Sequence, residues 1–169
     1  MNSKFLTKKD LKNTKFKKLG SKVNISKNVT IIGQENISIG SNVRIDDFTI
    51  ISAKDGFLEI GNNVHIGGQG YLGCAGKLKI GSNVNIAQGV KFYTKINDYI
   101  SYDGNNNKFF LGKITIGNNV IIGSNTVIVG KCIVKEGCTI GALSLVKKNL
   151  KDWSVYAGNP IKFIKFRKH

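Results

Sequence analysis

A strict period of six residues runs through this 169-residue chain and restricts its fold more than any other feature. In the C-terminal third, a branched aliphatic residue recurs at every sixth position, at Ile116, Ile122, Ile128, Val134, Ile140 and Val146. Small or apolar residues stand four positions after each of these, at Val120, Thr126, Cys132, Cys138, Ser144 and Leu150. The same spacing appears earlier, where the unit IGSNV or IGNNV begins at Ile39, Ile60 and Ile80, as it does again at Ile116.

This period excludes the common alternatives. An α-helix would place apolar residues three and four apart, and a β-meander would alternate them between irregularly spaced turns. A period of six fits short strands joined by tight corners, where Gly and Asn tolerate the left-handed backbone conformation. The aliphatic side chain of each face then points inward and stacks on its equivalent in the next coil. We therefore predict an all-β parallel β-helix, a hexapeptide-repeat solenoid.

Interruptions of the period define the expected organisation. We expect a basic N-terminal segment at residues 1–18, the β-helix at 19–151 and a C-terminal cap at 152–169. A polar insertion at residues 95–113, which contains DGNNN at Asp103–Asn107, should protrude as a loop. Long loops inside compact repeats are usually functional. The tail should fold back over the end of the solenoid, where a short helix could form.

The composition narrows the partners and the compartment. The formal net charge of +16 favours anionic ligands such as phosphorylated small molecules or anionic lipid. The basic residues are scattered without a recognised nucleic-acid-binding motif, and membrane contact by the N-terminal lysines is open but unsupported. We expect a cytoplasmic protein, because no apolar run of about 18 residues and no signal peptide is present. Cys74, Cys132 and Cys138 form no CxxC pair, so we expect reduced thiols and no metal site. Cys132 and Cys138 occupy inward fourth positions and should be buried.

The segment Ile114–Lys165, which ends in the AGNP motif at Ala157–Pro160, resembles the hexapeptide-repeat acyltransferases. The resemblance covers residues 19–165. It implies a left-handed β-helix, a homotrimer with active sites between subunits, and acetyl-CoA as co-substrate bound along the outer coils. A finer likeness at Val43–Ala53 and Ile60–Gly67 is to bacterial enzymes that N-acylate a nucleotide-linked amino sugar, such as a dTDP-4-amino-4,6-dideoxy sugar, for surface-glycan biosynthesis.

The catalytic base of the family has no obvious counterpart. In many members it is a histidine in the loop after an IAP or IAQ coil, and here that position falls on Asn97, with Asp98 beside it. Asparagine cannot accept a proton near neutral pH. His65 is the leading replacement, because its side chain should point outward and an imidazole titrates near neutrality. A surface histidine with only local contacts is the competing interpretation.

Other residues are candidates for binding the substrate. Asp46, Asp47 and Asp98 are candidates for orienting an ammonium group or a base, and capping of turns is the competing interpretation. Lys95 and Tyr99 are candidates for contacting an anionic nucleotide, and a solvated loop is the alternative. The family pattern IGAGSVV appears here as IGALSLV at Ile140–Val146, with Leu143 where a glycine is common. This points to a set of positions for the pantetheine arm and the phosphates of CoA, namely Gly123, Ala142, Ser144, Lys147, Lys148, Lys162 and Arg167.

Three functions remain in competition. The missing histidine favours N-acetylation, because an amine that has lost its proton is already a nucleophile, whereas a sugar hydroxyl needs a stronger base. O-acetylation of a sugar hydroxyl is the second hypothesis. A catalytically inactive β-helix that only binds a partner is the third. A γ-class carbonic anhydrase is excluded, because its metal needs three histidines and this chain has 2.

Overall fold

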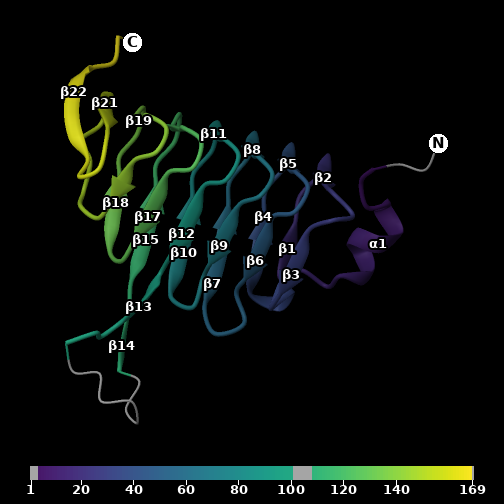
Figure 1. Ribbon diagram of the computed structural model, residues 1–169. Coiled ribbons are helices and arrows are strands. Elements are labelled where there is room, and N and C mark those ends of the chain that lie inside the picture. Colours follow the sequence, from purple (N-terminus) through teal and green to yellow (C-terminus); the bar gives the residue numbers. More distant parts are fainter. Residues whose placement is uncertain (1–3, 101–107, 169) are drawn as a thin grey trace.

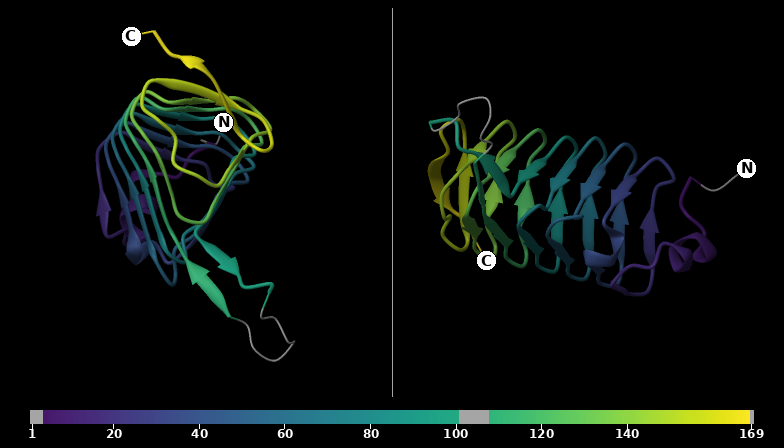
Figure 2. Two further views of the ribbon diagram at one scale, coloured as in Figure 1. Left: turned by 90° about the vertical axis from the view of Figure 1, so that its left-hand side faces the viewer. Right: turned by 90° about the horizontal axis from the view of Figure 1, so that it is seen from below.

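The computed structural model describes residues 4–100 and 108–168, and it shows a solenoid of stacked strands (Figure 1). Each coil contributes one strand to each of three sheets, and the coils trace a triangle when viewed along the axis (Figure 2). Neighbouring coils pair in parallel, for example Ile60 with Ile80 and His65 with Asn85. The parallel β-helix predicted from the period of six is therefore confirmed.

The three sheets are built as follows. The first sheet contains β1 (Lys18–Leu19), β4 (Ile37–Ile39), β7 (Phe57–Ile60), β10 (Lys77–Ile80), β15 (Lys113–Ile116) and β18 (Cys132–Val134). The second contains β2 (Val23–Ile25), β5 (Val43–Ile45), β8 (Val64–Ile66), β11 (Val84–Ile86), β16 (Ile121–Ile122), β19 (Thr139–Ile140), β21 (Ser154–Ala157) and β22 (Lys162–Phe166). The third contains β3 (Thr30–Ile32), β6 (Ile50–Ser52), β9 (Tyr71–Gly73), β12 (Lys91–Tyr93), β17 (Val127–Val129) and β20 (Leu145–Val146).

The core is a set of aliphatic stacks inside the prism. In the first sheet, Ile39 lies beside Ile60, which lies beside Ile80, and the stack continues through Ile116 to Val134. All of these side chains are buried. Burial of each one contributes about 1.5–3 kcal/mol. The six predicted aliphatic positions from Ile116 to Val146 are likewise buried, so the period identifies the core correctly.

The corner between the first and second sheets carries a ladder of asparagine side chains. Asn42, Asn63, Asn83 and Asn119 all have φ between 55° and 58°, a left-handed conformation that asparagine tolerates better than most residues. Each amide donates to the next coil, from Asn42 to Asn63 (2.9 Å), then to Asn83 (2.9 Å) and to Asn119 (3.2 Å). Asn119 in turn donates to Glu136 (2.9 Å). The corners are thus held by side chains as well as by the backbone.

The insertion is a β-hairpin of β13 (Lys95–Asn97) and β14 (Phe109–Leu111), which leaves the solenoid at the corner between the third and first sheets (Figures 1 and 2). The DGNNN segment lies outside the described residues. At the C-terminus, β21 continues the second sheet and β22 pairs with it antiparallel. The expected short helix is wrong, because Ser154–Ala157 extends the ladder of β19 and leaves the chain in an extended conformation.

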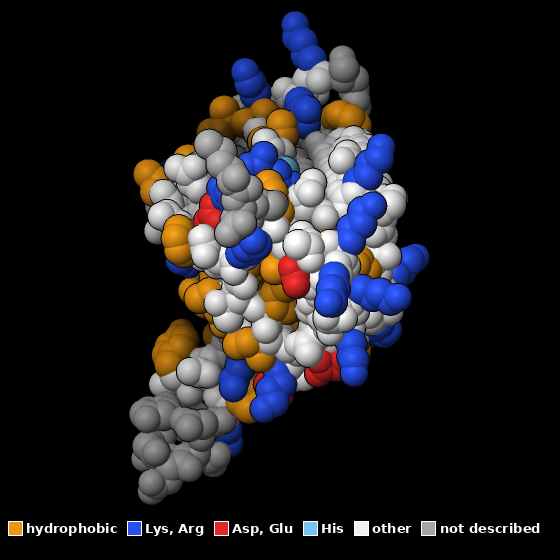
Figure 3. Space-filling view, turned by 90° about the vertical axis from the view of Figure 1, so that its right-hand side faces the viewer, with side chains coloured by type: hydrophobic (Ala, Val, Ile, Leu, Met, Phe, Trp, Pro, Cys, Tyr) orange, Lys and Arg blue, Asp and Glu red, His pale blue; other side chains and the backbone are white. Residues whose placement is uncertain are grey.

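The N-terminal segment contains α1 (Lys8–Asn13), and η1 (Gln34–Asn36) is a short 3₁₀ turn. Thr7 and Asp10 form a capping box at the start of α1, and Leu11 packs against the core. Seen from this end, Lys and Arg side chains are spread over most of the surface with few acidic groups between them (Figure 3). Within the described residues, no helix has the length and apolar character needed to cross a membrane.

Candidate functional site

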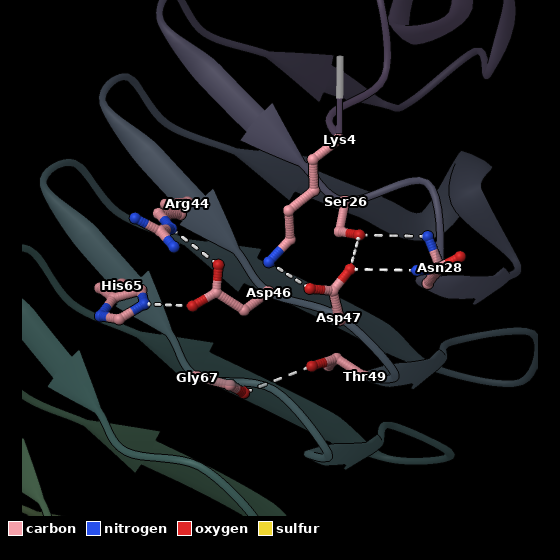
Figure 4. A network of polar contacts seen from close by, with 9 residues as sticks. All are labelled: Lys4, Ser26, Asn28, Arg44, Asp46, Asp47, Thr49, His65 and Gly67. Atoms are coloured by element: carbon pink, nitrogen blue, oxygen red, sulfur yellow. Dashed lines mark hydrogen bonds and ion pairs between the residues drawn. The ribbon is translucent and has the colours of Figure 1, made fainter. Parts of the chain in front are cut away.

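A charged cluster occupies the outer surface of the second sheet (Figure 4). Register places Arg44 of β5 directly beside His65 of β8, and both side chains point outward from the core. Asp46, at the corner that follows β5, accepts a hydrogen bond from Nε of Arg44 (2.7 Å) and contacts Nε2 of His65 through its other oxygen (2.8 Å). The side chain of His65 is 45% exposed and that of Asp46 is 17% exposed. The predicted outward orientation of His65 is confirmed.

The carboxylate of Asp46 determines which nitrogen carries the proton in a neutral His65 ring. Partial burial alone would raise the pKa of Asp46, but hydrogen bonds from His65 and Arg44 outweigh burial and lower the pKa below its usual value. Asp46 is therefore a carboxylate at neutral pH and can only accept hydrogen bonds. A neutral His65 then carries its proton on Nε2, which leaves the lone pair of Nδ1 free to accept a proton from a ligand. The arrangement is suited to a general base held by a carboxylate.

Asp47 turns away from this cluster although it follows Asp46 directly. Its carboxylate pairs with Lys4 and accepts hydrogen bonds from Ser26 and from Nδ2 of Asn28 (3.2 Å). These contacts lower the pKa of Asp47, with the Lys4 contact the largest cause. The two aspartates lie on a corner, and their carboxylates contact different partners. Asp47 instead ties the N-terminal segment to the second coil.

The predicted residues of the insertion lie on the hairpin at the corner between the third and first sheets, whereas His65 lies in the second sheet. Lys95 and Asn97 are exposed in β13, and Nζ of Lys95 lies 4.0 Å from the ring centroid of Phe109. Asp98 accepts a hydrogen bond from the amide of Ile100 (3.1 Å). Tyr99 is 83% exposed. A single subunit therefore does not bring Asn97 or Asp98 together with His65.

The predicted pantetheine residues share the corner between the second and third sheets. A Cβ atom at Gly123 would lie 2.4 Å from the amide nitrogen of Ala142, so this stack requires glycine. Ser144 is buried, donates to the carbonyl of Gly141 (2.7 Å) and accepts from the amide of Gly158 (3.0 Å). Its hydroxyl is thus engaged inside the chain. Leu143 has φ 57° and is 72% exposed, which explains why glycine suits this position.

The predicted phosphate-binding side chains fall into two groups. Lys147 and Lys148 are exposed at the corner after β20, and Lys162 is exposed in β22. Arg167 is different, because its guanidinium donates to the carbonyl of Asn119 (3.0 Å) and to that of Gly137 (3.2 Å), and lies over Trp153. Arg167 therefore closes the last coils of the solenoid, and its donors are partly occupied.

All three thiols are buried, which confirms the prediction made for Cys132 and Cys138. Burial raises the pKa of Cys74 and Cys138 to about 12 and that of Cys132 to about 11. A nucleophilic cysteine needs a depressed pKa and access to solvent, so these groups serve packing. Over the described parts of the chain, no cluster of three or more His, Cys, Asp or Glu side chains is placed to hold a metal ion.

Comparisons with known proteins agree with this architecture. Residues 113–148 match the family described as bacterial transferase hexapeptide (six repeats). A solved maltose O-acetyltransferase from Clostridium difficile shares the fold, with a TM-score of 0.65 at 24% identity over 95% of this chain and 75% of that one. The fold and its repeat are thus those of hexapeptide-repeat proteins.

Two relatives match almost the whole chain. A dTDP-4-amino-4,6-dideoxy-D-glucose acyltransferase from Escherichia coli is 36% identical over 96% of this chain and 88% of its own length. AntD, an N-acyltransferase from Bacillus cereus solved with dTDP and 3-hydroxybutyryl-CoA, is 34% identical with a TM-score of 0.90, over 99% of this chain and 92% of that one. The chain therefore belongs to the hexapeptide-repeat acyltransferase family, and the prediction of an acyltransferase is confirmed.

Sequence reasoning missed Arg44 as a member of the cluster. The signal is present in the repeat, because Arg44 and His65 are each the residue that follows the valine of an IGSNV or IGNNV unit. Equivalent positions in adjacent coils lie side by side on a sheet. Aligning the units would therefore have placed an arginine next to the candidate base.

Proposed function

We propose that this chain transfers an acyl group from a CoA thioester to the amine of dTDP-4-amino-4,6-dideoxyglucose or a close analogue. The observation that carries this proposal is the match over almost the whole chain to an acyltransferase named for that sugar nucleotide. A variant of AntD solved with dTDP-4-amino-4,6-dideoxyglucose and CoA adds support, at 35% identity and a TM-score of 0.90. The acyl group is an acetyl group in the simplest case.

The geometry of the charged cluster supports a role for His65 in this reaction. The ammonium group of the sugar must lose a proton before its nitrogen can attack. Because Asp46 contacts Nε2 of His65, the lone pair on Nδ1 is available to accept this proton. The free amine then attacks the thioester carbonyl and the new C–N bond forms. As the C–S bond breaks, the nitrogen gives up its second proton and the departing CoA thiolate takes up one proton, so that the products are an amide and the CoA thiol. Asn97 and Asp98 are proposed to contact the amine from the hairpin.

The proposed site combines His65 with Asn97 and Asp98, which a single subunit does not bring together, so we infer that more than one subunit contributes to it. The hairpin exposes apolar side chains, including Ile96, Phe110 and Leu111, and the third sheet exposes Ile32 and Ile50. Such apolar surface is typical of protein contacts. We infer a homotrimer in which the hairpin of one copy lies against a neighbour and completes its site. We further infer that the enzyme works in the cytoplasm and supplies a sugar nucleotide to surface-polysaccharide biosynthesis.

The test measures thiol release from acetyl-CoA and from 3-hydroxybutyryl-CoA. The acceptors are dTDP-4-amino-4,6-dideoxyglucose and, as a matched control, dTDP-glucose, which offers hydroxyl groups only. We expect release with the amino sugar and none above background with the control. Release with the hydroxyl acceptor would favour O-acylation. CoA binding without release from any acceptor would contradict the proposed substrate.

A further inference from the structure

A column of lysines marks the corner between the third and first sheets, at the base of the hairpin. Lys77 pairs with Phe57 on one side and with Lys113 on the other. Lys131 lies beside Lys113 in the next coil, because Ile114, which follows Lys113, pairs with Cys132, which follows Lys131. Each residue of the column follows a glycine, so that one side chain per coil points outward at the same place. The side chains of Phe57 and of the three lysines are all exposed.

The column is electrostatically unfavourable for the isolated chain. Strands of adjacent coils are about 4.8 Å apart, and like charges placed directly opposite each other destabilise a sheet. Among the described residues, Lys77, Lys113 and Lys131 form no ion pair, whereas the neighbouring Lys79 faces Glu59 at 4.0 Å. Lys77 has one compensating contact, because its ammonium group lies 5.9 Å from the ring centroid of Phe57. No carboxylate among the described residues pairs with the three aligned ammonium groups, so a ligand with several negative charges would explain them.

A cleft of about 510 Å³ lies along this column. Its lining includes the three lysines, Phe57 and Leu111 of the hairpin, and Asp55 is the one acidic residue among the described residues that line it. The volume is within the range of ligand pockets, about 300–1,000 Å³. Three ammonium groups therefore face one carboxylate inside a cleft of suitable size.

The floor of the cleft consists of backbone. A Cβ atom at Gly76 would lie 2.2 Å from the carbonyl oxygen of Gly112, and one at Gly112 would lie 2.1 Å from that of Gly130. Side chains are therefore excluded from this corner, and a ligand can approach the peptide groups while the lysines reach around it. Leu150 bridges to Val134, so the segment that contains Lys147 lies on the coil after that of Lys131. The positive charge therefore extends beyond the cleft.

We propose that the lysine column binds the diphosphate of a nucleotide, an inference that rests on the proposed function. Lysine binds phosphate as a point charge, and two adjacent phosphates can span two coils of the column. Phe57 supplies a ring that is 43% exposed at one end of the column, and nucleobases stack on such rings. Both proposed substrates carry a nucleoside diphosphate, one in the sugar nucleotide and one in CoA.

The test is titration calorimetry of the full-length protein with dTDP, with CoA and with inorganic pyrophosphate. The variants are Lys77→Gln and Lys113→Gln, and Lys79→Gln is the control because it removes a lysine of the same sheet that faces a carboxylate. We expect Kd for at least one nucleotide to rise about tenfold or more in each column variant, with no change in the control. The midpoint of thermal unfolding without ligand should stay the same or rise, because repulsion is relieved.

The outcomes separate the two nucleotides and the two proposals. A loss for dTDP alone assigns the column to the sugar nucleotide, and a loss for CoA alone assigns it to the coenzyme. Phe57→Leu should weaken nucleotide binding and leave pyrophosphate unchanged. Unaltered Kd values in both column variants, with a wild type that binds dTDP and CoA, would overturn this inference only. A wild type that binds neither would overturn the proposed function itself.

Discussion

Replacing Asp46 by asparagine tests the charged cluster most directly. Asparagine keeps the shape of the side chain but removes its charge and one of its two acceptor oxygens. Its single oxygen can accept from Arg44 or from His65, and its NH₂ group would face a donor. The imidazole then loses the partner that fixes its tautomer and orientation. We expect kcat/KM to fall about 10- to 100-fold, mainly through kcat, because a small misplacement of a catalytic group has an effect of this size.

The effect on stability follows from exposure and from the pKa of Asp46. The side chains of Arg44 and His65 are 52% and 45% exposed, so solvent screening limits each contact to about 0.2–1 kcal/mol. Asp46→Asn should therefore lower the free energy of unfolding by about 1 kcal/mol at neutral pH. Because folding lowers the pKa of Asp46 from 3.8, this stabilisation is complete above that value. It is lost as the pH falls through the lower folded-state pKa, where wild type and variant should become equally stable.

The assay combines urea unfolding at fixed protein concentration, at neutral and acid pH, with steady-state thiol release. Asp47→Asn is the matched control, because Asp47 has the same chemistry one residue away but contacts Lys4, Ser26 and Asn28. It should leave kcat near the wild-type value. If Asp46→Asn keeps full activity, or if both variants lose activity equally, the proposed orientation of His65 by Asp46 is wrong.

Three further predictions concern the base, the corners and the core. His65→Gln should reduce the rate of N-acylation strongly at neutral pH and less at raised pH, where the amine loses its proton without help from a base. An equal loss of rate at every pH would argue against a proton-accepting role for His65. Asn83→Ala should destabilise the fold by about 2 kcal/mol in urea unfolding, and Asn83→Gly by less, because glycine adopts φ 57° without the strain that alanine would carry; equal losses would contradict the backbone explanation. Cys74, Cys132 and Cys138 should resist alkylation by iodoacetamide in the native protein and react fully in denaturant, since burial raises their pKa values to about 12, 11 and 12; rapid native reaction would show that the coils open.

The two ends of the chain differ in how far the sequence predicts their structure. At the N-terminus, Thr7 and Asp10 have the spacing of a capping box. This spacing indicates helix α1, which the basic composition of the segment does not reveal. The C-terminal tail was harder. Ser154–Ala157 forms a strand because β19 offers an open edge, and that edge exists only once the preceding coils are stacked.

The sequence by itself determined the coil and its core. A period of six places one branched side chain inward on each face, and Ile116, Ile122 and Ile128 need no other information to be assigned to the interior. Apart from Arg44 and His65, which the repeat units align, the tertiary structure decided which outward residues meet. Asp46 reaches His65 across 19 residues, and Lys77 meets Lys113 only because the hairpin between them is looped out. Coils of unequal length hide these contacts from the sequence, because register between strands fixes them.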